Sequence, residues 1–116
     1  MTDAIHLEHL GRMTGGDRQL ERELFGLFDR QASTLLERMR AADPASVAAL
    51  AHTLKGSALG VGAFAVAEAA SAAEAAREPE ARKEAIGRLA VAVEAARAHI
   101  AVLLGVNEGG AEGGKG

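Results

Sequence analysis

The feature that most constrains the fold is a regular stripe of apolar residues in the segment 79–104. Its members alternate at steps of three and four positions: Ile86, Leu89, Val93, Ala96, Ile100 and Leu103. This spacing places them on one side of an α-helix, which must bury that side against other helices. A second segment, from residue 17 to about 41, carries a similar stripe with Phe28 beside it: Leu20, Leu24, Leu27, Gln31, Leu35 and Met39. The sequence therefore predicts an all-α fold built from long helices.

Capping and helix-breaking residues mark where the first two helices begin and end. Asp3 is the expected cap of a short first helix. That helix is expected to end near Leu10, because Gly11 and the Gly15–Gly16 pair follow. Asp17 is the expected cap of the long second helix, since aspartate is among the preferred residues at this position.

The strongest boundary in the chain is Asp43-Pro44, which suits the cap and the first position of a third helix. That helix is expected to run to residues 60–62, with a fourth over 63–77 and a fifth from Pro79 to about 104. Short connections favour antiparallel neighbours. We therefore expect an up-and-down antiparallel four-helix bundle with a short extra N-terminal helix over residues 1–104. The Gly-rich residues 105–116 are expected to form a flexible tail.

Composition excludes several classes of protein. There is no Cys, so neither a disulfide framework nor a thiolate zinc site nor a thiol nucleophile is available. The net charge of −3 and the lack of a basic block argue against nucleic acid as a partner. We expect no contact with a membrane, because no apolar run approaches the roughly 18 residues of a spanning helix. The first residues lack the pattern of a signal peptide, so we expect a cytoplasmic protein.

Alanine poses a question about the core. The chain has 27 Ala and only three aromatic residues, and alanine buries little apolar area. Either the helices pack unusually closely, or part of the alanine lies on a surface whose side chains must stay small. The sequence supports both explanations, in different segments.

In the third helix one histidine faces away from the core. At 100° per residue the large apolar side chains form a single stripe: Val47, Leu50, Leu54 and Val61. His52 lies almost opposite this stripe, beside Lys55 and Gly56. The rest of its face is small or apolar, comprising Ala45, Ala48, Ala49 and Leu59. A solvated helix face would carry more polar residues, and a mid-helix glycine costs about 1 kcal/mol relative to alanine.

The chemistry of this face suggests a nucleophile that works with a partner protein. Histidine has an ordinary pKa of about 6.5, so at pH 7 its ring is mostly neutral and able to attack. Lys55 is a mobile charge suited to phosphoryl oxygens, and Gly56 leaves room for close approach. The alternative is a plain surface histidine. No metal ligand or acidic partner of His52 is evident from the sequence, so a metal site is not expected.

The run from Ala51 to Ser57 (AHTLKGS), followed by Gly62 ten positions after His52, resembles the signature of histidine-containing phosphotransfer (HPt) domains. The resemblance extends over about residues 3–104 and implies a four-helix bundle. It implies that His52 accepts a phosphoryl group from an aspartate of a response-regulator receiver domain and passes it to another. Lys55 would then stabilise the phosphoryl charge, Gly56 would give the partner access, and Ser57 would serve packing.

The resemblance also implies a phosphoryl carrier of a two-component phosphorelay and not an enzyme. The chain would have no cofactor of its own, and Mg²⁺ would belong to the receiver. Expected partners are receiver domains, a hybrid histidine kinase, or both, and the chain is expected to be a monomer. Ala45, Ala48, Ala49 and Leu59 would form the docking surface.

Two other functions stay open at this point. The chain could be a docking or inhibitory module that binds a histidine kinase or receiver without carrying phosphate. It could also be the phosphoacceptor domain of a larger kinase.

Other candidate residues have simpler interpretations. His6 and His9 are three positions apart but lack a third metal ligand, and His99 is expected at the boundary of the core. Phe25, Ala32 and Leu36 lie off the main stripe of the second helix, where they either cover the first helix or belong to the docking surface.

Overall fold

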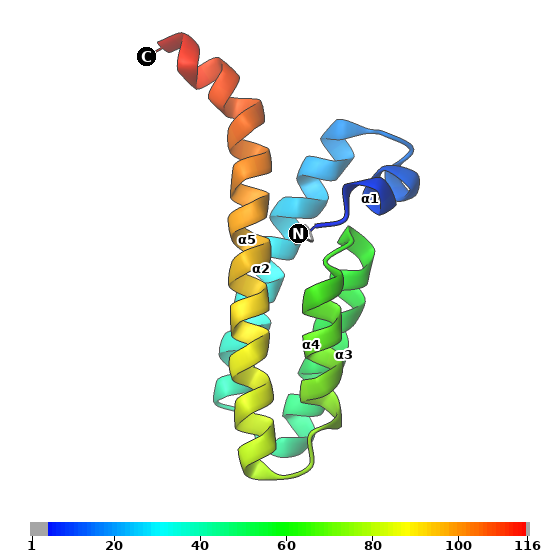
Figure 1. Cartoon of the computed structure of the whole chain (residues 1–116), viewed down its shortest axis with the longest axis vertical. Helices are drawn as coiled ribbons and strands as arrows, with labels where there is room; N and C mark the ends of the chain where they lie inside the picture. Colours follow the sequence, from blue (N-terminus) through cyan, green and yellow to red (C-terminus); the bar gives the residue numbers. More distant parts are fainter. Residues whose placement is uncertain (1–4, 116) are drawn as a thin grey trace.

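Over the residues that the structure describes, the chain folds into five α-helices without a strand. The computed structural model describes the backbone of residues 5–115 and the side chains of residues 5–105. The helices are α1 (Leu7–Thr14), α2 (Arg18–Arg40), α3 (Pro44–Val61), α4 (Phe64–Ala75) and α5 (Pro79–Lys115). Helices α2 to α5 form the bundle, and α1 lies across one end of it (Figure 1).

The four long helices pack as neighbours around a square. α3 contacts α2 and α4, α5 contacts the same two helices, and α3 and α5 lie diagonally opposite. The predicted up-and-down bundle with a short N-terminal helix is therefore confirmed. Among the helices described, none is long and apolar enough to cross a membrane.

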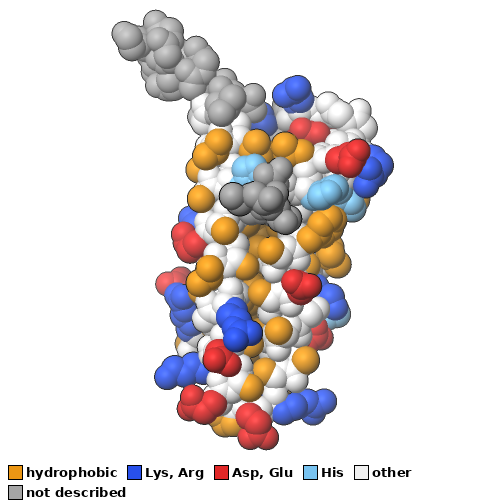
Figure 2. Space-filling model, viewed as in Figure 1, with side chains coloured by type: hydrophobic (Ala, Val, Ile, Leu, Met, Phe, Trp, Pro, Cys, Tyr) orange, Lys and Arg blue, Asp and Glu red, His pale blue; other side chains and the backbone are white. Residues whose placement is uncertain are grey.

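Helices α3 and α4, which contact each other, both bury alanine. Its fully buried members on these two helices are Ala51, Ala58, Ala67, Ala70 and Ala73. Because the alanine side chain ends at Cβ, helices that meet through it can approach closely. Figure 2 shows the α4–α5 side of the bundle, where apolar side chains run lengthwise and charged ones lie at the edges, at the end where α5 begins and also between them.

The starts of α2 and α3 are where the sequence predicts them. The Asp17 carboxylate accepts a hydrogen bond from the Leu20 amide at 3.0 Å, and the Asp43 carboxylate accepts one from the Ser46 amide at 2.7 Å. Hydrogen bonds from the Ser46 backbone and side chain hold the pKa of Asp43 below its ordinary value. Pro44 occupies the first turn of α3, where its missing N–H costs no hydrogen bond.

The expected bounds of α1 are wrong. The helix starts after His6, whose Nδ1 accepts a hydrogen bond from the His9 amide at 3.2 Å, and Asp3 lies outside the described residues. It passes through Gly11 and ends at Thr14, and the next residue, Gly15, adopts the left-handed conformation with φ 65°. The Gly15–Gly16 pair ends α1 because only glycine adopts this conformation readily, whereas Gly11 keeps helical geometry.

The predicted buried side of α2 is also wrong in part. Leu20 and Leu27 are 39% and 49% exposed, although both belong to the predicted stripe. The side chains of α2 that are buried are Phe25, Phe28, Ala32, Leu35, Leu36 and Met39. The apolar residues of α2 cover more than one side of the helix, and packing against α3 and α5 selects the side that carries two phenylalanines.

Helix α5 begins at Pro79 as expected and continues past residue 104 to Lys115. A helical backbone does not measure mobility, so the flexibility of residues 105–116 stays a prediction.

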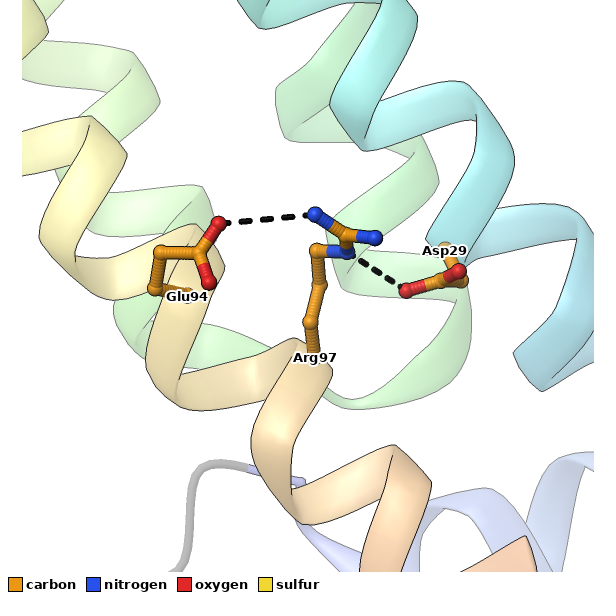
Figure 3. Close-up of polar contacts among 3 residues, drawn as sticks. All are labelled: Asp29, Glu94 and Arg97. Atoms are coloured by element: carbon orange, nitrogen blue, oxygen red, sulfur yellow. Dashed lines mark hydrogen bonds and ion pairs between the residues drawn. The ribbon is translucent and has the colours of Figure 1, made fainter.

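Figure 3 shows how α5 is joined to α2: Arg97 Nε donates to Asp29 Oδ1 at 2.7 Å, and its Nη1 donates to Glu94 Oε2 at 3.4 Å. The hydrogen bond to Asp29 raises the pKa of the Arg97 guanidinium.

The segment before α1 joins the end of α3 to α5. The His6 amide donates to the Gly62 carbonyl at 2.8 Å, and the Ile5 amide donates to His99 Nδ1 at 3.1 Å. Gly62 ends α3 with φ 77°, and a Cβ at this position would lie 2.9 Å from the His6 carbonyl oxygen. Gly62 is therefore required both for its conformation and for the close approach of His6.

We expect Gly62→Ala to lower the free energy of unfolding by about 1–3 kcal/mol, because it combines a left-handed non-glycine residue with a steric clash. Gly60→Ala is the matched control, since a Cβ there meets nothing within 4 Å and the change raises helix propensity. Urea unfolding followed by circular dichroism measures both. Equal stability of the two variants would contradict the role given to Gly62.

Candidate functional site

His52 projects from the outer side of α3 into solvent. Its side chain is 70% exposed. The core side of the same helix consists of Val47, Ala51, Leu54, Ala58 and Val61, and Leu50 is half-buried beside them. The orientation that the apolar stripe predicts for His52 is therefore the observed one.

An acidic side chain from the neighbouring helix holds the imidazole. Glu74, in the last turn of α4, places its Oε2 3.1 Å from His52 Nδ1. Glu74 is about half as exposed as His52, at 34%. The expectation that His52 has no acidic partner is therefore wrong: the carboxylate comes from α4 and not from the face of α3.

The contact with Glu74 determines which ring nitrogen is available for reaction. An ionised carboxylate can only accept a hydrogen bond, so Nδ1 must carry the hydrogen in this geometry. In a neutral ring the other nitrogen, Nε2, then keeps its lone pair. The arrangement presents one defined nucleophilic atom to solvent.

Lys55 and Gly56 lie one turn further along α3. Lys55 is half-buried and forms no hydrogen bond or ion pair with the side chains described for residues 5–105. Gly56 is exposed, and a Cβ built on it would meet nothing within 4 Å. Packing within the described chain therefore does not require a glycine at this position.

The surface around His52 has small and apolar side chains. Ala45 and Ala49 are exposed, Ala48 is half-buried, and Leu59 is 44% exposed. Seven positions separate Leu59 from His52, which places it about 10 Å further along the axis of α3. We call these four residues the small-residue face.

The remaining candidate residues contact other parts of the fold and lie apart from the His52 ring. Ser57 Oγ donates to Gln31 Oε1 of α2 at 2.8 Å and so links two helices. Phe25, Ala32 and Leu36 are buried in the core and cannot form a docking surface. The rings of His6 and His9 pack against Phe64, with centroids 5.4 Å and 5.0 Å apart.

Comparison with known proteins identifies one family that this chain matches. Neither the curated proteins nor the solved structures contain a significant match to the chain. A sequence model of one protein family, described as the Hpt domain, matches residues 18–99, a range that includes the four-helix bundle up to the middle of α5 and contains His52, Lys55 and Glu74. The chain belongs to the Hpt domain family.

Proposed function

We propose that this chain carries a phosphoryl group on His52 between receiver-domain aspartates in a two-component phosphorelay. The observation that carries the proposal is the exposed His52 ring with Nδ1 bound to Glu74, on a helix face of small side chains. Membership of the Hpt family supports histidine phosphotransfer in general. The residue, the atom and the partner surface are our assignments.

In the proposed reaction the Nε2 lone pair attacks the phosphorus of an aspartyl phosphate. A P–N bond forms, and the P–O bond to the aspartate breaks with its electron pair returning to that carboxylate. The ring becomes positively charged, because Nδ1 keeps its hydrogen. Glu74 stabilises this charge, much as the buried aspartate of a Ser-His-Asp triad stabilises an imidazolium. The reverse steps deliver the phosphoryl group to another aspartate.

The chain supplies only part of the site that phosphoryl transfer needs. The transition state is stabilised mainly by positioning and by positive charge around the phosphoryl oxygens. Lys55 is the one cation that we assign to this task, as a flexible point charge one helical turn from His52. We propose that the receiver provides Mg²⁺ and the other groups, and that this chain acts as a carrier without a cofactor of its own.

The small-residue face is the proposed docking surface. Gly56 weakens the helix by about 1 kcal/mol relative to alanine, yet no neighbour within the described chain needs the space. A partner backbone that approaches the His52 ring would need it. This face of three alanines and one exposed leucine, next to Gly56, offers little steric hindrance to such a partner. We further propose that the chain acts as a cytoplasmic monomer.

The first prediction tests the carrier itself. When the chain is mixed with a phosphorylated receiver and Mg²⁺, label should move to it in an acid-labile, base-stable form. His52→Ala should accept none, while His99→Ala should still accept it. Lys55→Ala should slow transfer about tenfold, less than the loss of a donor in a buried anion site, because Lys55 is only half-buried. Labelling of His52→Ala would refute the assignment, and receiver binding without any phosphohistidine would favour a docking or inhibitory module.

The second prediction concerns Glu74. The neutral His52 ring should be hydrogenated at Nδ1, and the phosphoryl group should appear on Nε2, both measured by ¹⁵N NMR of the imidazole. Glu74→Ala should shift the ring toward the Nε2–H form and slow transfer, because it removes the acceptor and the negative charge. Glu68→Ala is the control, as Glu68 is an exposed residue of the same helix. An unchanged tautomer in Glu74→Ala would contradict the proposal.

The third prediction tests the docking surface. Ala48→Glu and Ala49→Arg should each reduce the rate of transfer at limiting receiver concentration, because a large charged side chain would keep the partner from His52. Their thermal stability should stay close to that of the original chain. Ala95→Glu provides the control, since Ala95 is exposed on α5, the helix diagonal to α3. Normal transfer by both face variants would place the docking surface elsewhere.

A further inference from the structure

A concave site lies at the end of the bundle where α2 ends and α3 and α5 begin. Its volume is about 510 Å³, within the range of pockets that bind small molecules. It is lined by Met39, Arg40, Ala42, Val47, Pro79, Arg82, Lys83, Ile86 and Gly87. None of these residues belongs to the His52 site or to the small-residue face, so the pocket has no part in the proposed phosphotransfer.

The pocket combines an apolar floor with a cationic rim. Met39 and Val47 are buried, and Ile86 is half-buried. Arg40, Arg82 and Lys83 lie at the rim, and no carboxylate is among the lining residues. Arg82 is held in place because its Nη2 donates to the Arg77 carbonyl at 3.0 Å.

The carboxylates nearest to the pocket do not line it, so they do not neutralise its cations from inside the cavity. Asp43 follows the lining residue Ala42, but its carboxylate accepts the capping hydrogen bond from Ser46. Glu80 and Glu84 line a separate hollow that shares Lys83 and Gly87 with the pocket. Arg40, Arg82 and Lys83 therefore belong to a lining that includes no carboxylate.

Gly87 keeps one wall of the pocket open. It is exposed in the middle of α5, and a Cβ built there would meet nothing within 4 Å. Glycine has a lower helix propensity than alanine, and alanine is the commonest residue of this chain. A larger side chain at this position would extend into the space of the pocket.

We propose that this pocket binds a small amphipathic anion, a free carboxylate with an unbranched apolar tail. The tail would lie on Met39, Val47 and Ile86, and the carboxylate would meet the cations at the rim. Methionine adapts well to flexible apolar ligands. The volume of this concave site suits one small molecule, and for that reason we assign a free ligand and not the surface of a lipid bilayer.

Decanoate below its micelle concentration is the test ligand, followed by ¹H–¹⁵N NMR of the whole chain. Saturable shifts should appear in amides of the lining residues, and decanol should bind at least about tenfold more weakly because it lacks the charge. Arg40→Glu and Lys83→Glu should each weaken decanoate binding about tenfold. Arg88→Glu makes the same charge change on α5 outside the pocket lining and should leave the affinity within about twofold.

Gly87→Leu should abolish binding by filling the pocket while preserving the helical circular dichroism signal. His52→Ala should bind decanoate normally, which separates this inference from the proposed function. Equal affinity for decanol, shifts outside the lining, or an unchanged affinity in both charge-reversal variants would each overturn the proposal. It would equally be overturned if anionic phospholipid vesicles bound the chain and decanoate did not.

Discussion

The close contact between α3 and α4 is the constraint on which the rest of the site depends. Both helices bury alanine side chains, and alanine allows packed helices to approach closely. Their separation brings the Glu74 carboxylate within hydrogen-bond distance of His52, although the ring itself stands in solvent. Nine of the 27 alanines are buried in the described part of the chain, and three others belong to the small-residue face.

Sequence reasoning succeeds for features that depend on residues close together in the chain. The caps Asp17 and Asp43 act on amides three positions away, and the direction of His52 follows from the apolar residues of its own helix. It fails for α2, where apolar side chains surround much of the helix. Which of them are buried depends on where α3 and α5 lie, and no pattern within α2 contains that information. The start of α1 depends likewise on the contact between His6 and Gly62.

Glu74 is not predicted from the pattern of α3 because its contact with His52 joins two different helices. The sequence nevertheless contains information about this pairing. Antiparallel helices joined by a tight turn place residues that are equally far from the turn at the same height. His52 and Glu74 each lie eleven positions from Ala63, which follows Gly62 at the turn between α3 and α4. Counting outward from that turn would have identified the partner. The distance and the ring nitrogen involved still required the structure.

The same carboxylate has a consequence for how long the proposed carrier would retain its signal. Hydrolysis of a phosphohistidine is accelerated by a base that activates a water molecule beside the phosphorus. In the described part of the chain the polar contact of the imidazole is with Glu74, which is bound to the far side of the ring from Nε2. If His52 is phosphorylated as we propose, Glu74 would not be placed to speed hydrolysis of the phosphohistidine. The lifetime of the phosphohistidine would then depend on how often a receiver binds.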